Sequence, residues 1–326
     1  MKTASEVKNS NRTRTLAHET RKNKQWLSIL VIVTLVVAVA FVSCGGGSGS
    51  GSGGSAGGKG SYKIKMTTEQ YGECVFRLFG SGIAMVDWGD GSENVSLTIS
   101  EYDIDNAARG GNPGGVRFTH TYPNESIRTI TIYGDNITGL QCLSRYFTSL
   151  DVSKNTALTI LDCGGNQLTS LDVSKNSTLT QLGCSGNQLT SLDVSKNTAL
   201  THLYCNDNQL TKLDVSKNTA LTHLGCSDNQ LSSLDVNKNT ALTWLSCEGN
   251  QLTRLDMSKN TVLTSLGCER NQFTGSALNA LFGTLHNDDN VVGWWGSKGV
   301  YINNNPGEND CDRSIATNKG WRFTWN

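Results

Sequence analysis

The apolar residues in the middle of the chain follow a fixed pattern of 21 residues. From position 137 to about position 273, the spacing L-x-x-L-x-C-x-x-N-x-L repeats without an insertion. The cysteines that share one place in this repeat are Cys142, Cys163, Cys184, Cys205, Cys226, Cys247 and Cys268. A fixed period near 20 residues is typical of a solenoid, in which each repeat forms one coil and contacts only its neighbours.

Each repeat also has a pattern of its own. In Leu161-Asp162-Cys163 the apolar residues alternate with a variable one, which predicts a strand with one buried face. We expect stacked coils with one apolar column, and an inward asparagine that bonds the backbone where strand pairing ends. The second half of the repeat, residues 168–176, has nearly the same spacing and lacks helical periodicity. The pattern therefore predicts two parallel sheets, not a sheet backed by helices.

This repeat resembles the leucine-rich repeat family in its short bacterial form, over residues 136–273. The resemblance implies a mainly β fold with a right-handed solenoid of 21-residue coils. The first unit departs from the pattern because Arg145 stands where the later units have asparagine, which fits an atypical terminal coil. The asparagines that keep the pattern are Asn166, Asn187, Asn208, Asn229, Asn250 and Asn271.

Residues 274–326 break the period and suit a mixed α/β cap. Residues 276–285 have helical spacing, residues 299–302 predict one more strand, and a short helix and a last strand are expected within 310–318 and 321–325. A solenoid needs a cover for the leucines of its last coil. We expect the aromatic residues of this segment to form the core of the cap, namely Trp294, Trp295, Trp321 and Trp325.

Residues 61–135 contain short alternating runs that predict a small all-β domain. The stretches 86–92 (VDWGDGS) and 118–123 (FTHTYP) resemble the PKD-type immunoglobulin-like sandwich. Asp87, Asp90 and His120 suit a metal or acid–base site by residue type. A tight turn at a strand end explains the same residues better, because Asp bonds its own backbone there. We expect this domain to be a spacer.

The first 60 residues predict export and anchoring. A basic segment precedes an uncharged apolar run over residues 27–42, which ends at Phe41-Val42-Ser43-Cys44. This ending resembles the bacterial lipobox, and the resemblance implies that Cys44 carries a lipid after cleavage of residues 1–43. The alternative is an uncleaved membrane anchor. The Gly/Ser-rich residues 45–60 form a flexible tether. Either way we expect a membrane-anchored protein outside the cytoplasm, at the outer membrane, the cell surface or in the periplasm.

Net charge, cysteine spacing and the motifs present limit the classes of function that this chain can have. The chain has 28 basic and 28 acidic residues, so its formal net charge of zero gives no electrostatic footprint for nucleic acid. The repeated cysteines are expected to be buried and reduced, because strands about 4.8 Å apart hold Cβ atoms farther apart than a disulfide requires. No phosphate loop, zinc-type cysteine pairing or catalytic set is recognisable. We therefore expect neither an enzyme nor a cofactor.

Comparison of the coils with one another indicates where a ligand binds. Two outward columns of the first strand vary: Gly139, Ile160, Gln181, His202, His223, Trp244, Ser265 and Gln141, Asp162, Gly183, Tyr204, Gly225, Ser246, Gly267. Since small residues flank Tyr204, we expect its ring to stand clear of the sheet. Rigid aromatic groups suit both protein contacts and sugar stacking. The predicted ligand-binding residues are Ile160, Asp162, Gln181, His202, Tyr204, His223 and Trp244.

Two other columns have a structural interpretation. His202 and His223 are one coil apart and could approach a metal, but their column neighbours Gln181 and Trp244 offer no third ligand, so we expect a polar surface pair. In the second half of the repeat an invariant column runs through Asp151, Asp172, Asp193, Asp214, Asp235 and Asp256. Carboxylates this close repel one another, and a lysine column three residues on is the expected offset, with calcium as the alternative.

The whole chain resembles leucine-rich lipoproteins of the Bacteroidetes type. The resemblance and the variable columns together predict a non-enzymatic, envelope-anchored protein. Its expected role is protein–protein interaction or adhesion through the variable sheet. The alternative is a glycan-binding component of a nutrient-capture system.

Overall fold

The structure is a computed structural model that describes residues 63–69, 71–102, 114–142, 146–291, 293 and 296–323. Within it, the described residues of 63–100 and 116–323 belong to one compact unit. The unit is mainly β, and the predicted leucine-rich-repeat solenoid is confirmed by the register of its strands. The predicted segment at residues 27–42, Cys44 and the tether lie outside the described residues.

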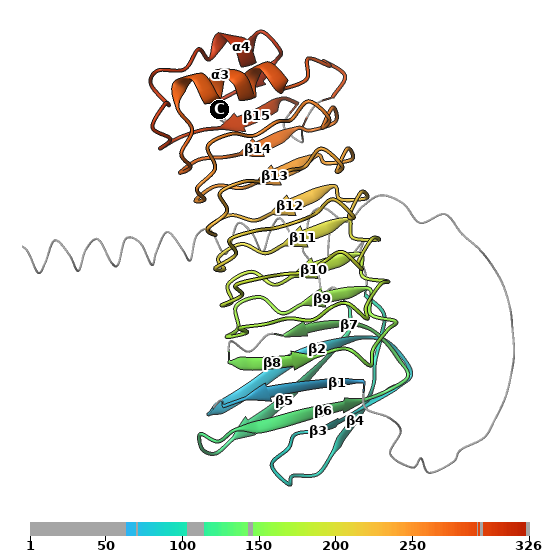
Figure 1. The fold of residues 1–326 in the computed structure, drawn as a ribbon. Helices are drawn as coiled ribbons and strands as arrows, with labels where there is room; N and C mark the ends of the chain where they lie inside the picture. The colour runs from blue at the N-terminus through green and yellow to red at the C-terminus, as the bar shows by residue number, and fades with distance from the viewer. Residues whose placement is uncertain are drawn as a thin grey trace, which may run out of the picture. The chain divides into compact units, whose positions relative to one another are not determined.

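The unit begins with a sandwich of two sheets (Figure 1). One sheet contains, in spatial order, β4 (Val95–Thr98), β3 (Ile83–Asp87), β6 (Arg128–Tyr133), β1 (Ile64–Thr68) and β8 (Phe147–Asp151). The other sheet begins with β5 (Val116–Tyr122), β2 (Gly72–Ser81) and β7 (Asn136–Cys142). Aromatic rings fill the core, where the Phe76 centroid lies 5.5 Å from Phe118 and 5.6 Å from Trp88. The predicted sandwich is confirmed, and its PKD type stays a prediction.

The sandwich and the solenoid share strands. β7 pairs antiparallel with β2 of the sandwich, with Leu78 opposite Leu140, and parallel with β9 (Ile160–Asp162) of the solenoid, with Leu140 opposite Leu161. One continuous sheet therefore runs from the sandwich through the coils, because a single strand satisfies the backbone groups of both neighbours. The first coil rests directly on the sandwich core.

Six strands repeat at 21-residue intervals along the solenoid. They are β9 (Ile160–Asp162), β10 (Gln181–Gly183), β11 (His202–Tyr204), β12 (His223–Gly225), β13 (Trp244–Ser246) and β14 (Ser265–Gly267). Figure 1 shows them stacked between the sandwich and the cap. The central leucine of each strand and the following cysteine are fully buried, from Leu161 and Cys163 to Leu266 and Cys268. The cysteines from Cys142 to Cys268 are buried, as predicted, and their reduced state stays a prediction.

The prediction of a second parallel sheet is wrong. We call the second half of each coil, residues 168–176 and their equivalents, the turn side. The turn side forms a strand only in the first coil, where β8 pairs antiparallel with β1. In later coils it forms turns, and a backbone bond from the Gln188 N–H to the Leu168 carbonyl links neighbouring coils there. The sequence has strand spacing, but its polar side chains compete for the backbone groups that a sheet would use.

The invariant aspartates are one part of this competition. The Asp193 carboxylate accepts the Ser195 N–H at 2.9 Å. The same bond recurs at Asp151, Asp172, Asp214, Asp235 and Asp256. This backbone bond is the main cause of the lowered pKa of Asp172, Asp193 and Asp214. The neighbouring lysines lower the pKa of these aspartates less than the backbone bond does. The turn geometry therefore explains the identical aspartates of successive coils better than attraction by the lysine column does.

Two columns of buried asparagine complete the backbone pairing. Asn208 donates its side-chain amide to the carbonyls of Cys184, Cys205 and Asn206, and its Oδ1 accepts the Leu189 N–H at 3.0 Å. The predicted role of the inward asparagines is confirmed. A second column on the turn side, Asn176, Asn197, Asn218, Asn239 and Asn260, bonds two carbonyls of the coil before it.

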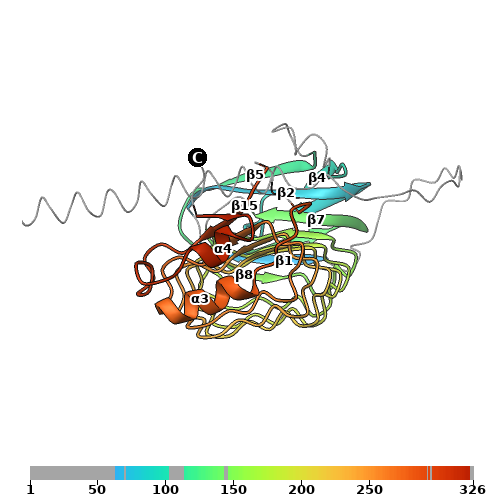
Figure 2. The same cartoon turned by 90° about the horizontal axis from the view of Figure 1, so that it is seen from above.

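The C-terminal cap covers both sides of the last coil. It contains α3 (Gly275–Thr284), β15 (Lys298–Tyr301), α4 (Ser314–Thr317) and β16 (Trp321–Arg322). β15 extends the parallel sheet beyond β14, whereas α3 lies over the turn side, where the Thr284 hydroxyl accepts the Met257 N–H (Figure 2). Trp321 is buried, which confirms its predicted core role, while Trp294, Trp295 and Trp325 lie outside the described residues.

The end of α3 is closed by a lysine. The ammonium of Lys319 donates to the carbonyls of Phe282, Gly283 and Leu285, at 3.1, 2.6 and 2.8 Å. These are carbonyls that a helix leaves without an internal partner, and a cation is favoured at this end of the helix dipole. Hydrogen bonds thus join the C-terminal part of the cap to α3, and α3 to the coil beneath it.

Candidate functional site: the outward face of the parallel sheet

The outward side chains of β9 to β14 form a surface that we call the strand face. Direct pairing places Gln181, His202, His223, Trp244 and Ser265 side by side on successive strands. The neighbouring column is mostly glycine and serine, apart from Asp162 and Tyr204. Bulky groups therefore gather at β11, β12 and β13.

Three rings on this face form a stack. The imidazoles of His202 and His223 are nearly parallel, with centroids 4.6 Å apart and an interplanar angle of 9°. The Trp244 ring continues the series, 6.2 Å from His223 and tilted by 25°. The spacing follows the distance between paired strands, so the backbone holds the rings in place. The stack is an apolar, rigid surface at the middle of the sheet.

The prediction that the Tyr204 ring stands clear of the sheet is wrong. Tyr204 is 8% exposed, and its ring lies 6.1 Å from Trp244 and 6.3 Å from His202. A Cβ atom on Gly225 would come within 3.1 Å of Cδ1 of Tyr204. The absence of a side chain at Gly225 therefore leaves space in which the Tyr204 ring packs against the sheet, so the ring does not project into solvent.

The stack carries polar atoms that the protein leaves unused. Each histidine bonds through Nδ1 to the hydroxyl of the preceding threonine, at 2.9 Å for both His202 and His223. Nε2 of His202 and the hydroxyl of Tyr204 are buried and have no hydrogen-bond partner among the described residues. An unpaired buried polar group costs about 1 to 3 kcal/mol, and because both atoms are buried, a ligand that only covers the face does not reach them.

Burial keeps the two histidines neutral. It lowers the pKa of His202 to about 4 and that of His223 to about 3, and the adjacent His202 ring adds to the effect at His223. At neutral pH both rings present a flat apolar face and hydrogen-bonding nitrogens without charge. The face is therefore suited to stacking and hydrogen bonding, not to an anionic ligand.

The two imidazoles do not form a metal site with a third ligand. They stack face to face, and Gln181 and Trp244 flank them as expected. In the described part of the chain, no group of three or more His, Cys, Asp or Glu side chains is arranged to hold a metal ion. The pair is better understood as part of the ring stack.

The other predicted ligand residues lie toward the sandwich end of the face. Ile160 is two strands from His202, with Gln181 between them. Asp162 accepts bonds from the Gln141 side chain and the Gly164 N–H, both at 3.2 Å, while burial raises its pKa. Ile160 and Asp162 are therefore separated from the rings by a strand, and their role in binding stays a prediction.

A charged group at the other end of the face was missed from the sequence. Arg270 lies 2.8 Å from Asp228 and 3.5 Å from Glu248. Burial raises the pKa of the neighbouring Glu269 to about 7, and within the described part of the chain its Oε2 has no hydrogen-bond partner. The position after each cysteine varies as Gly164, Ser185, Asn206, Ser227, Glu248 and Glu269. Comparing the coils at the position after each cysteine would have identified the two glutamates of this charged group, Glu248 and Glu269.

The aspartates and histidine of the sandwich have the predicted turn role. Asp87 accepts the Gly89 N–H at 2.9 Å, and Asp90 accepts the Ser92 N–H at 3.0 Å and lies 2.7 Å from Nε2 of His120. The His120 ring also stacks on Trp88 at 4.9 Å. These contacts join the turn after β3 to β5, so we assign the group to the fold of the sandwich.

No protein-family model matches the sequence, and no curated protein matches it. Among solved structures, the functional domain of InlJ from Listeria monocytogenes, described as including a cysteine ladder, is 33% identical over 52% of this chain and 40% of that one, with a TM-score of 0.44. An internalin C2 from Listeria monocytogenes is 21% identical over 58% of this chain and 81% of that one, with a TM-score of 0.47.

A third similar structure is from a plant. The leucine-rich-repeat ectodomain of the Arabidopsis thaliana receptor kinase GASSHO1/SCHENGEN3 is 25% identical, covers 47% of this chain and 19% of that one, and has a TM-score of 0.38. That ectodomain is in complex with CASPARIAN STRIP INTEGRITY FACTOR 2. The chain spans less than half of the InlJ and GASSHO1/SCHENGEN3 structures. Among the described residues of the present chain, no helix is long and apolar enough to cross a membrane.

Proposed function

We propose that this chain is a non-enzymatic binding protein that holds a protein partner on its strand face. One observation carries the proposal: His202, His223 and Trp244 form a ring stack on outward columns that differ between coils. Rigid rings lose little entropy on binding, and aromatic groups near the centre of a contact contribute much of its affinity. The stack has this central position on the sheet.

The surroundings of the stack suit a protein surface. Toward the cap, Arg270, Glu248 and Glu269 form a charged rim. An apolar centre with a polar rim is the usual composition of a protein interface. We infer a partner with an apolar or aromatic centre and hydrogen-bonding groups around it.

The experiment is to probe immobilised full-length chain against a protein array and a glycan array, side by side. We expect protein ligands that bind the wild type and lose most of their signal with Trp244→Ala. The matched control is Asp193→Ala on the turn side, which should bind as the wild type does. Flat ring faces also stack on sugars, so glycan ligands that depend on Trp244 would establish the alternative function and overturn this one.

We also propose that the protein is anchored at the cell envelope through a lipid on Cys44. The support is the apolar run that ends in Phe41-Val42-Ser43-Cys44. A radiolabelled fatty acid should enter the wild type and a Cys311→Ala control but not Cys44→Ala. Equal labelling of Cys44→Ala would contradict a lipid on Cys44, and no labelling of the wild type would favour the uncleaved segment.

A further inference from the structure

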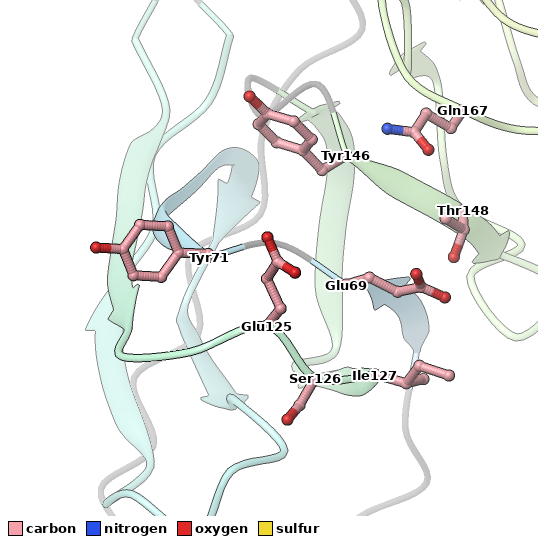
Figure 3. Close-up of a pocket in the computed structure, with 8 residues that line it drawn as sticks. All are labelled: Glu69, Tyr71, Glu125, Ser126, Ile127, Tyr146, Thr148 and Gln167. Carbon is pink, nitrogen blue, oxygen red and sulfur yellow. The ribbon is translucent and has the colours of Figure 1, made fainter.

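A second surface lies where the sandwich meets the first coils. A cleft of about 570 Å³ opens beside the turn from β1 to β2, the turn from β5 to β6, the start of β8 and the second coil (Figure 3). Its lining includes Glu69, Tyr71, Glu125, Tyr146 and Gln167. None of these residues belongs to the strand face, so the cleft is independent of the function proposed above.

The cleft gathers exposed apolar side chains. The large hydrophobic residues exposed in the described part of the chain are Tyr71, Ile83, Leu97, Ile127, Tyr146 and Val262. Half of them line this cleft: Tyr71 is 66% exposed, Ile127 72% and Tyr146 48%. Scattered exposed hydrophobic groups need no explanation, but a cluster in a concave site marks a place where a ligand or partner packs.

The charge of the cleft is negative. Figure 3 shows the Glu125 carboxylate between the Tyr71 ring and Glu69, with Tyr146 above, and neither carboxylate belongs to an ion pair of the described residues. No basic residue is among those that line the cleft. The nearby Arg128 is buried and donates to the carbonyl oxygens of Asn124 and Ser126, so its hydrogen bonds are made there, although its positive charge remains beside the cleft. The lining therefore carries two carboxylates without an ion-pair partner among the described residues, with that of Glu125 on the side of Tyr71 and that of Glu69 on the side of Thr148 (Figure 3).

We propose that this cleft binds an arginine-containing or lysine-containing segment of a protein partner. The two carboxylates offer charge-assisted hydrogen bonds to a cationic head group, and the tyrosine faces attract a cation and pack on its aliphatic stem. Ile127 supplies an apolar floor for the neighbouring residue of the segment. The chemistry selects for positive charge, in contrast to the uncharged rings of the strand face.

The test uses two short fluorescent peptides, acetyl-Gly-Arg-Gly-Arg-Gly-amide and its counterpart with glutamine in place of both arginines. Anisotropy on the full chain should show at least tenfold tighter binding of the arginine peptide at low salt, and this preference should shrink in 0.5 M NaCl. The double variant Glu69→Gln, Glu125→Gln should lose the preference, and Tyr146→Ala should weaken binding severalfold.

The matched control removes two exposed carboxylates elsewhere, through Glu93→Gln and Asp310→Asn. This variant has the same net charge as the double variant in the cleft and should bind the arginine peptide as the wild type does. All substituted side chains are at the surface, so urea unfolding should verify an unchanged fold. Equal binding of the two peptides, no binding of either, or an equal loss in the control would overturn the proposal.

Discussion

The two sides of each coil have nearly the same apolar spacing but satisfy their backbone groups in different ways. On the strand side, the backbone of each strand bonds the backbone of the next, as in the pairing of β10 with β11, so most outward side chains are not needed to satisfy backbone groups. On the turn side, the Asp193 carboxylate and the Asn197 amide take up backbone groups themselves. The comparison explains why one side is uniform between coils and the other is free to vary.

This difference has a functional consequence. Side chains that bond the backbone contribute to stability, most where the bonds are buried, so uniformity on the turn side is evidence for a structural role. The outward positions of the strands have no such constraint, and large rings could accumulate there. Binding is therefore expected on the strand face, and stability effects on the turn side and in the asparagine columns.

The largest stability effect is expected in the asparagine columns. Asn208→Ala removes four bonds to buried backbone groups and should cost on the order of 3 kcal/mol, whereas Asn218→Ala removes two and should cost about half as much. Urea unfolding of both variants measures the difference. Equal losses would show that the bonds counted in the structure do not determine the stability of the coils.

A comparable effect is expected for the buried tyrosine of the strand face. Tyr204→Ala should cost about 2 to 4 kcal/mol because it empties the space over Gly225. Tyr204→Phe removes only a hydroxyl without a partner, so stability should be unchanged or slightly higher. Thermal unfolding of the pair checks this. A clear loss in Tyr204→Phe would mean that the hydroxyl is bonded after all.

The sequence predicted the repeat, the strand columns and the caps because each depends on spacing alone. It did not predict the turn side, since Leu-Asp-Val has the spacing of a strand and only the bonds of Asp193 and Asn197 show why pairing fails. It placed the rings on one face but missed the position of Tyr204, which depends on the space above Gly225. The cleft near Tyr146 joins segments far apart in the sequence, so no local pattern indicates it.

The histidine stack predicts a pH effect on stability. The pKa of His202 and His223 falls on folding from 6.5 to about 4 and about 3, so below pH 6.5 the unfolded chain takes up protons first. Their contribution is full above pH 6.5 and declines as the pH falls toward 4. Glu269 acts in the opposite direction, because its raised pKa favours the fold as the pH drops below about 7. The histidine effect must therefore be measured as a difference between variants.

The measurement is the urea midpoint of the wild type and of His202→Gln, His223→Gln between pH 7.5 and pH 4.5. The wild type should lose more stability than the double variant over this range, with the gap opening below pH 6.5. A constant gap would contradict the burial of neutral imidazoles.

The smallest stability effect is expected on the exposed turns. Asp214→Ala removes a solvent-exposed bond to the Ser216 N–H, and a change within about 0.5 kcal/mol is typical of such sites. The lowered pKa of Asp214 means that its contribution is present at neutral pH and is lost as the pH falls below the ordinary value of 3.8. Thermal unfolding should therefore show a larger difference from the wild type at pH 7 than at pH 3.

The affinity of a protein ligand from the array for two variants tests the central comparison most directly. Calorimetry should show a loss of about 2 kcal/mol for Trp244→Ala, because an anchor near the centre of the contact is removed. The matched turn-side variant, Ser191→Ala with Asp193→Ala, should bind within twofold of the wild type. The account is contradicted if the turn-side variant abolishes binding while Trp244→Ala binds as tightly as the wild type.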